Sequence, residues 1–275
     1  MSLLFFARQS SQQGLLERWV PQLQQRQITF ATALVYLALI ALAELVTTYA
    51  EPRVGLTLHG GLLIILLLHT ALASKYAYHR LLLSLALAPL IRILSLSLPL
   101  VGFPLLYWYL IISVPLLAAT ILTARILGFS RDQLGLTIRK IPLQLLVAVT
   151  GFAFGMMEYY IIKPEPLIAS FSWRGMLVPG LILMVCTGFA EELIFRGLIQ
   201  RTSVQALGRF GLLYTALLFA VLHIGYRSVV DMVFVFGVAL LFGWVAERTW
   251  SLLGVSLAHG LTNIILFLIM PFWRG

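Results

Sequence analysis

The chain has 275 residues, of which 61% are hydrophobic and 11% charged, and its mean hydropathy is +0.99. Soluble domains average about half apolar and about a quarter charged residues, so this composition excludes an ordinary water-soluble enzyme. It also excludes intrinsic disorder and a disulfide scaffold, because the single cysteine, Cys186, cannot form an internal bridge. A spanning helix needs about 20 apolar residues, which predicts an all-α, polytopic transmembrane bundle of about eight or nine spanning helices.

The net charge of +9 comes from 19 basic and 10 acidic residues. In a membrane protein, basic residues collect in cytoplasmic loops and face anionic lipid headgroups. No basic cluster is interleaved with aromatic residues, so we expect the lipid bilayer as a partner and no nucleic acid.

The N-terminal segment, residues 1–28, is rich in glutamine and carries three arginines but no long apolar run. It lacks the apolar core and small-residue cleavage site of a secretory signal. We therefore expect this segment to be retained and to lie at the cytoplasmic face.

Charge-free stretches predict the spanning helices in chain order. We expect one near residues 29–49, one near 54–74, two between 81 and 124, and five near 141–162, 175–205, 210–226, 228–246 and 250–271. Pro99, Gly102 and Pro104 divide the long apolar stretch into the third and fourth helices. The polar loop 128–140 then separates a four-helix N-terminal region, 29–127, from a C-terminal core, 141–273.

The distribution of basic residues predicts the orientation in the membrane. With the N-terminus inside, most basic loop residues lie on the cytoplasmic side: Lys75, Arg80, Arg131, Arg139, Lys140, Arg201, Arg209 and Arg248. Nine spans then place the C-terminus on the opposite side.

Charged residues inside spanning segments cost several kcal/mol, so each one needs a partner or a function. Glu44, Arg92 and Glu158 are isolated in the sequence. We expect them to pair within the bundle, Glu44 with Arg92.

The sixth predicted helix contains two adjacent glutamates, Glu191 and Glu192, followed by Arg196. At about 100° per residue, Glu192 and Arg196 are about 40° apart and form a same-face pair. Glu191 points about 100° away from Glu192, which leaves its carboxylate free for chemistry.

Two later helices carry polar residues at i,i+4 spacing: Phe219 with His223, and His259 with Asn263. Glu192 lies 16 residues before the expected turn at Gly208 and His223 lies 15 residues after it, so both lie about 23 Å from the turn. The carboxylates, imidazoles and amide are therefore expected to meet within the membrane.

Such a set suits general-base attack by water on a carbonyl. Burial makes a carboxylate a better base, a histidine can help to polarise the water, and imidazole and amide groups can donate to an oxyanion. The competing possibility is a zinc site made by Glu191, His223 and His259. We rank the metal-free reaction first, because the chain has no HExxH motif and Asn263 is a poor zinc ligand but a good donor.

The three motifs resemble those of the CPBP family of intramembrane endopeptidases, the CAAX protease and bacteriocin-processing proteins. EExxxR is matched by Glu191, Glu192 and Arg196, FxxxH by Phe219 and His223, and HxxxN by His259 and Asn263. Each motif alone is weak, but all three occur in order, and the resemblance covers about residues 141–271.

The resemblance implies intramembrane proteolysis of a membrane-embedded or lipidated substrate, of the prenylated CAAX type in the characterised eukaryotic members. By position, it implies that Glu191 and His223 activate water and that His259 and Asn263 form the oxyanion site, with no cofactor. Glu192, Arg196 and Phe219 would support these residues. Bacterial members of the family are linked to bacteriocin immunity, so a non-catalytic membrane scaffold or immunity protein is the alternative function.

Overall fold

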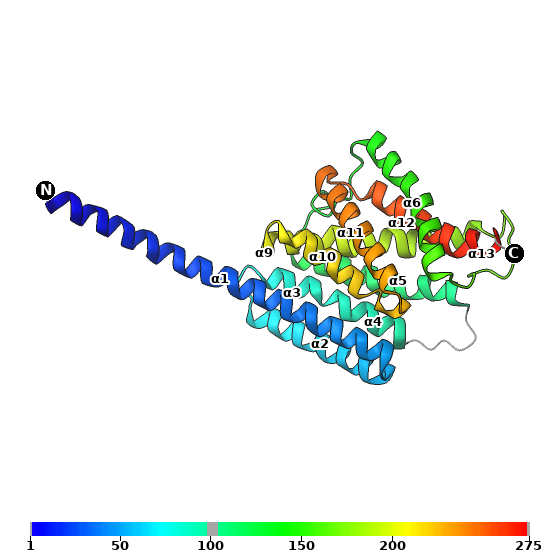
Figure 1. Ribbon diagram of the computed structural model, residues 1–275, viewed down its shortest axis with the longest axis horizontal. Helices are drawn as coiled ribbons and strands as arrows, with labels where there is room; N and C mark the ends of the chain where they lie inside the picture. Colours follow the sequence, from blue (N-terminus) through cyan, green and yellow to red (C-terminus); the bar gives the residue numbers. More distant parts are fainter. Residues whose placement is uncertain (1, 98–103, 274–275) are drawn as a thin grey trace. The chain divides into compact units, whose positions relative to one another are not determined.

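The computed structural model describes residues 2–97 and 104–273, and every regular element in these ranges is a helix. Contacts divide the chain into two units, Met1–Leu39 and Ile40–Gly275. The first unit is the N-terminal part of the long helix α1 (Ser2–Tyr49). The second unit contains the remaining elements and all candidate site residues (Figure 1).

The first half of the second unit continues from α1 through five helices: α2 (Pro52–Leu72), α3 (His79–Leu85), α4 (Leu87–Ser97), α5 (Leu105–Ile126) and α6 (Ile141–Ile162). A composite helix follows, in which α-helical and π-helical turns alternate: α7 (Leu177–Ile182), η1 (Leu183–Phe189), α8 (Ala190–Glu192), η2 (Leu193–Ile199) and α9 (Gln200–Leu207). The last elements are α10 (Phe210–Val221), the 3-10 turn η3 (Ile224–Tyr226), α11 (Val229–Thr249), α12 (Leu253–Ile264), the π-helical η4 (Ile265–Ile269) and α13 (Met270–Trp273).

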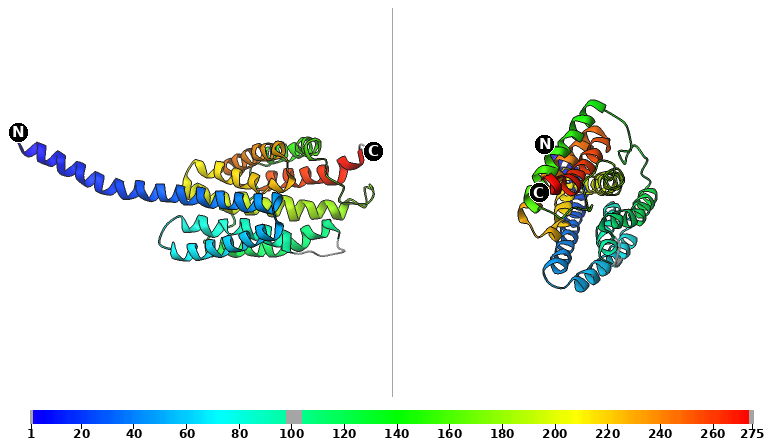
Figure 2. Two further views of the ribbon diagram at one scale, coloured as in Figure 1. Left: turned by 60° about the horizontal axis from the view of Figure 1, so that its bottom comes forward. Right: turned by 90° about the vertical axis from the view of Figure 1, so that its right-hand side faces the viewer.

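Eight helices in the described part of the chain are long and apolar enough to cross a bilayer. A ninth apolar segment, Phe210–Tyr226, is shorter. Within the second unit, successive helices run back and forth along a common direction (Figure 2). The all-helical, multi-span fold predicted from composition is confirmed.

The outward faces of these helices are apolar, as a lipid-facing surface requires. Ile64, Leu68, Leu122, Leu146 and Val149 are all between 59% and 66% exposed. A water-soluble chain does not expose so much contiguous apolar surface, because that surface would drive association. The apolar side chains therefore face outward, toward lipid, and the polar residues face inward.

Most of the predicted helices lie where the sequence places them, and α6 has the expected bounds of 141–162. The first candidate span, Gln24–Tyr49, agrees with the span expected near residues 29–49. The helix that contains it, α1, begins earlier, at Ser2, because its glutamine-rich and leucine-rich start has good helix propensity. Pro99 and Gly102, expected to break the third and fourth helices, lie outside the described residues, and Pro104 directly precedes α5.

Glycines allow the backbones of η1 and α6 to approach the backbone of α12 unusually closely. A Cβ added to Gly188 of η1 would lie 2.6 Å from the backbone nitrogen of Gly260, and one at Gly151 of α6 would lie 2.3 Å from the carbonyl oxygen of Ala258. Small residues permit this close approach between membrane helices. The helix that carries His259 and Asn263 is thus held between two backbones.

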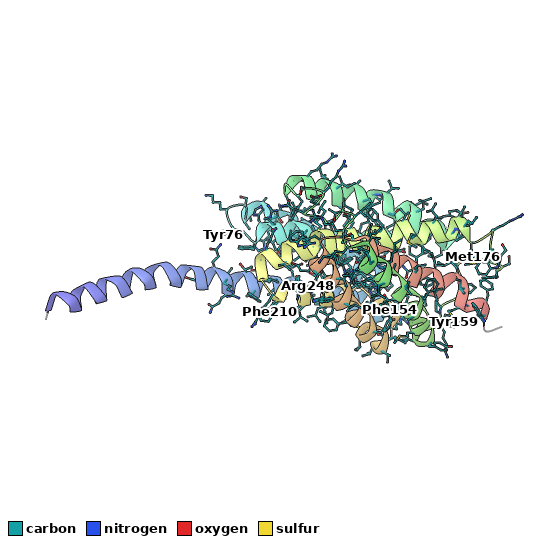
Figure 3. All side chains as sticks on the ribbon, turned by 90° about the horizontal axis from the view of Figure 1, so that it is seen from above. Tyr76, Phe154, Tyr159, Met176, Phe210 and Arg248 are labelled. Atoms are coloured by element: carbon teal, nitrogen blue, oxygen red, sulfur yellow. The ribbon has the colours of Figure 1, made fainter. Side chains whose placement is uncertain are left out.

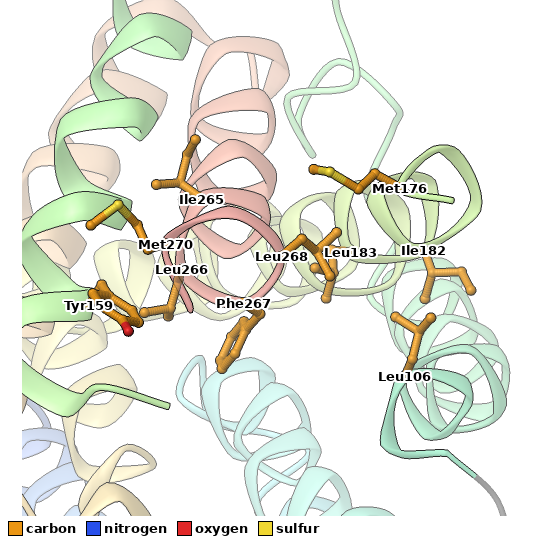
Figure 4. Close-up of a cluster of buried hydrophobic side chains, with 10 residues drawn as sticks. All are labelled: Leu106, Tyr159, Met176, Ile182, Leu183, Ile265, Leu266, Phe267, Leu268 and Met270. Carbon is orange, nitrogen blue, oxygen red and sulfur yellow. The ribbon is translucent and has the colours of Figure 1, made fainter. Parts of the chain in front are cut away.

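A buried apolar cluster is formed by side chains of α5, α6, the composite helix, η4 and α13 (Figure 4). It joins the composite helix to η4 and includes Leu183 and Leu268, which are fully buried. The loop after α6 reaches the cluster through a hydrogen bond from the backbone nitrogen of Leu167 to the carbonyl oxygen of Phe267, 3.2 Å long. These contacts fix the C-terminal end of the helix that carries Asn263.

The number of membrane spans, eight or nine, depends on whether the shorter helix α10 crosses the bilayer. If Phe210–Tyr226 crosses the membrane, reporter fusions after residue 208 and after residue 227 lie on opposite faces, and fusions after 135 and 275 do so too. We expect this result, with residue 135 on the cytoplasmic face. If the reporters fused after residues 208 and 227 lie on the same face, α10 does not cross the membrane and the nine-span topology is wrong.

Candidate active site

The two adjacent glutamates lie in α8, a three-residue α-helical segment between the π-helical segments η1 and η2. π-helical turns are rare, occur mostly as short bulges inside α-helices, and are frequent at functional sites. Here they place Glu192 facing inward, fully buried, while the side chain of Glu191 remains 33% exposed. The two neighbouring carboxylates therefore occupy different environments.

Glu192 has two partners, both of which contact the same carboxylate oxygen. Arg196 Nη1 donates to Glu192 Oε1 over 2.9 Å, and His259 Nδ1 lies 2.8 Å from that oxygen. Arg196 is 1% exposed and its guanidinium lies 4.5 Å from the centre of the Phe219 ring. Glu192 thus joins the first and third sequence motifs, and Phe219 of the second motif packs over the arginine.

Glu191 has a looser contact with the same histidine. Its Oε2 lies 3.8 Å from His259 Nε2, beyond direct hydrogen-bond distance. Because the Glu192 carboxylate can only accept, His259 Nδ1 donates to it, and the Nε2 edge of the ring faces Glu191. His259 therefore lies between the two carboxylates, one on each ring nitrogen.

His223 follows the end of α10, where the chain leaves the helix and enters η3. Its Nδ1 donates to the backbone carbonyl of Phe219 over 2.8 Å, since a carbonyl only accepts. In the neutral ring this hydrogen bond leaves Nε2 as an acceptor. The ring also packs against Phe219, with centroids 4.8 Å apart.

Asn263 is oriented by a residue that the motifs do not include. Its Nδ2 donates to Thr187 Oγ1 over 2.8 Å, and the Thr187 hydroxyl donates in turn to the carbonyl of Leu183. One Nδ2 hydrogen of the amide remains for another acceptor. Thr187 lies four residues before Glu191, and this i,i+4 spacing is the only signal in the sequence that could have revealed it.

All seven candidate residues line one small cavity of about 80 Å³. They are Glu191, Glu192, Arg196, Phe219, His223, His259 and Asn263. The cavity lies part-way along the bundle: its lining residue Phe154 is placed between Phe210 and Arg248, near one end, and Tyr159 and Met176, near the other (Figure 3).

A second, larger cavity of about 330 Å³ adjoins the first. The two share five lining residues: Tyr109, Glu191, Phe219, His223 and Tyr226. Its remaining lining is mostly apolar and comes from α4, α5 and the composite helix: Ile91, Leu105, Ile112, Leu116, Ile194 and Phe195 among others. An apolar chamber therefore opens directly onto Glu191 and His223.

The expected pairings of the isolated charges are only partly right. Glu44 binds Arg92 through both carboxylate oxygens, as the sequence predicted. Glu158 does not pair: within the described residues it has no hydrogen-bond or ion-pair partner, and its carboxyl group lies in the wall of the first cavity, 8% exposed. The carboxyl group lies in the cavity wall instead, and the prediction that Glu158 has a partner is wrong.

The alternative zinc set is Glu191, His223 and His259. In residues 2–97 and 104–273, no three His, Cys, Asp or Glu side chains are already grouped as they would be around a metal ion. Both histidines use Nδ1 in hydrogen bonds, His259 to Glu192 and His223 to a backbone carbonyl, and their Nε2 atoms are the ones that a metal would take. The zinc set therefore stays the alternative to the metal-free reaction.

Comparison with protein families gives one match. Residues 172–265 match the family described as Type II CAAX prenyl endopeptidase Rce1-like. Searches of the curated proteins and of the solved structures give no match. The matched segment holds all three motifs and covers about a third of the chain. The resemblance inferred from the motifs is thus confirmed as a similarity of residues 172–265 to the Rce1-like family of CAAX prenyl endopeptidases.

Proposed function

We propose that the chain is a glutamic-type intramembrane endopeptidase that hydrolyses a peptide bond of a membrane-associated substrate. The observation that supports this most is the geometry at Glu191. It is a partly exposed carboxylate at the boundary of two cavities, with His259 Nε2 3.8 Å away and His223 in the same wall. The match to a CAAX endopeptidase family supports the same reaction class.

The reaction begins with a water molecule held by Glu191 and His223. Glu191 accepts one proton as the water oxygen bonds to the scissile carbonyl carbon, and the carbonyl oxygen becomes an oxyanion. The second Nδ2 hydrogen of Asn263 is placed to donate to that oxyanion, and so is the Nε2 proton of His259 in its imidazolium form, in which both ring nitrogens carry a proton. When the C–N bond breaks, the proton held by Glu191 passes to the leaving nitrogen, giving a carboxylic acid and an amine.

Glu192 and Arg196 act through His259 in this scheme. The hydrogen bond from Nδ1 to Glu192 fixes the orientation of the ring, and Arg196 balances the buried carboxylate. A buried carboxylate that orients an imidazole in this way is a recurring feature of hydrolytic sites. This assigns unequal roles to two neighbouring glutamates.

The substrate that fits the second cavity has an apolar or lipidated segment next to the bond that is cut. Ile91, Leu105 and Leu116 line the chamber, and the chamber opens onto Glu191. A prenylated CAAX-type peptide has this chemistry, and the description of the matched family names such substrates.

The direct test uses the purified full chain in lipid nanodiscs with a farnesylated CAAX peptide, followed by mass spectrometry. We expect release of a C-terminal fragment that carries a free amine. The matched controls are the same peptide without the lipid and the Glu191→Gln protein. Equal cleavage of both peptides would show that the second cavity does not bind the lipid. Cleavage by the Glu191→Gln protein would show that Glu191 is not the base.

We expect the activity not to depend on a metal ion, because the chain has no HExxH motif and Asn263 is a poor zinc ligand but a good hydrogen-bond donor. Elemental analysis of active protein should find less than stoichiometric zinc, and chelators should leave turnover unchanged. Activity that is lost to a chelator and restored by zinc would replace this mechanism with the metalloprotease alternative.

Replacing Thr187 with valine should disturb the oxyanion site without removing a motif residue. Valine keeps the shape of the side chain but cannot accept the hydrogen bond from Asn263 Nδ2. We expect turnover to fall by about tenfold and KM to change little, because an oxyanion donor acts mainly in the transition state. The control is Thr215→Val in α10, which removes a buried hydroxyl bonded only to the carbonyl of Gly211. An equal loss in both proteins would assign the effect to folding.

A further inference from the structure

The turn that carries His223 is tied to helices of the N-terminal half by two arginine side chains. The turn starts at Leu222, after the last residue of α10, and ends at Arg227. Carbonyl groups at the end of a helix have no partner within the helix, so they need donors from elsewhere. Here the donor to Leu222 comes from a distant part of the sequence.

Arg92 of α4 is that donor. Its Nη2 donates to the backbone oxygen of Leu222 over 3.0 Å. The same guanidinium binds both carboxylate oxygens of Glu44 through Nε and Nη2. A two-point contact between arginine and a carboxylate fixes the plane of the guanidinium, and with it the direction of the hydrogen bond to Leu222.

Glu44 is itself held from the other side. Its side chain is fully buried, and Oε1 lies 3.3 Å from Nε2 of His59 in α2, which is also fully buried. Three helices, α1, α2 and α4, thus contribute one side chain each to a buried polar cluster that ends at the Leu222 carbonyl.

The other end of the turn is bound to α1. Arg227, which has a positive φ of 56°, donates from Nη2 to the backbone oxygen of Thr48 over 2.7 Å. Its guanidinium also lies 5.8 Å from the centre of the Tyr49 ring. The turn is therefore held at both its start and its end.

The bond to Leu222 acts directly on the geometry of His223. The Leu222 carbonyl and the His223 N–H belong to one planar peptide unit, so a donor on that oxygen fixes the plane from which His223 extends. The N–H side of the same peptide donates to Ala220 over 3.0 Å. With both sides of its peptide bonded and Nδ1 on the Phe219 carbonyl, the imidazole has one orientation.

We propose that Arg92, held in place by Glu44, is a positioning residue that orients His223 toward Glu191. This gives the N-terminal helices, which lie outside the matched residues 172–265, a part in the active site. The effect on turnover rests on the function proposed above, whereas the effect on the orientation of the ring does not.

The first test measures the ring of His223 directly. The chain has five histidines, so protein labelled with ¹⁵N-histidine gives few ring signals, and the His223→Gln protein assigns the signal of interest. The variant is Glu44→Gln with Arg92→Gln, which avoids leaving one buried charge without its partner. We expect the His223 signals to shift and broaden in this double variant.

The control removes another arginine–glutamate pair, in which Arg201 is buried and Glu247 is partly exposed. Arg201 Nη1 lies 3.3 Å from Glu247 Oε2, and its Nη2 donates to a backbone carbonyl, that of Ala246. Neither residue lines the two cavities next to Glu191. Arg201→Gln with Glu247→Gln should leave the His223 signals unchanged.

The second test measures kinetics with a cleavable peptide. We expect kcat of the Glu44/Arg92 double variant to fall by about 10²-fold while KM stays within about twofold, because misplacing a catalytic group by about 1 Å has an effect of that size. Arg92→Lys, which keeps one donor for Leu222, should recover part of kcat. The control pair should keep the wild-type kcat.

The outcomes separate this proposal from the proposed function. His223 signals that match wild type in the Glu44/Arg92 double variant would overturn the positioning role, whatever the activity. Shifted signals in a protein that never cleaves would support the positioning role and count against the endopeptidase. If the Glu44/Arg92 and Arg201/Glu247 double variants lose kcat equally, and Arg92→Lys recovers none of it, then Arg92 contributes to folding only.

Discussion

Glu191→Gln should abolish turnover while leaving the protein folded. An amide has the shape of the carboxyl group but cannot accept the proton of the attacking water, and loss of a general base alone reduces rates by about 10²–10⁴-fold. Glu191 is 33% exposed and has no partner closer than His259 Nε2 at 3.8 Å, so its replacement breaks no buried ion pair. The measurements are peptide cleavage and thermal unfolding in the same detergent.

The Glu191→Asp protein is the informative companion, because it keeps a base and withdraws it by one methylene group. We expect measurable but reduced cleavage from it. If Glu191→Gln cleaves as fast as wild type, another group is the base, and Glu158 in the same cavity wall is the next candidate.

Glu192→Gln should act first on stability. Its carboxylate is fully buried and binds both Arg196 and His259, so the change leaves Arg196 as a buried charge without a counter-ion. Breaking a buried pair by removing one partner costs about 3–5 kcal/mol. We expect a lower unfolding temperature and a lower yield in detergent, with reduced activity in the fraction that folds.

A double variant, Glu192→Gln with Arg196→Gln, distinguishes the sources of the loss. If the unpaired charge is the cause, removing the arginine as well should recover part of the stability, and the single effects will not add. The activity should not recover, since His259 still lacks its carboxylate. A Glu192→Gln protein that is stable but inactive, beside an active Glu191→Gln protein, would reverse the two roles.

The sequence predicts much of this site because helix periodicity determines which side chains share a face. The i,i+4 spacing of Glu192 and Arg196 gives a 2.9 Å ion pair, and the equal distances from the turn at Gly208 bring Glu192 and His223 to one cavity. Glu44 and Arg92 pair because charges within an apolar bundle find each other.

Other features depend on contacts that periodicity does not encode. Thr187 is an ordinary helix residue in the sequence, and its bond to Asn263 follows only from how η1 packs on α12. The contact between Glu192 and His259 joins residues 67 positions apart. Glu158 was expected to have a partner, but the cavity that accommodates it is formed by several helices together.

The alternation of helix types around the glutamates limits how the length of this segment can change. Deleting one residue from η1, such as Cys186, would return the π-helical turn to α-helical hydrogen bonding. A π-helical turn holds one more residue than an α-helical turn, so this change would redirect the side chains at and next to the turn. Either the Gly188 contact with α12 or the aim of Glu191 at His259 would then be lost. The segment Leu183–Ile199 can therefore vary in side chains far more easily than in length.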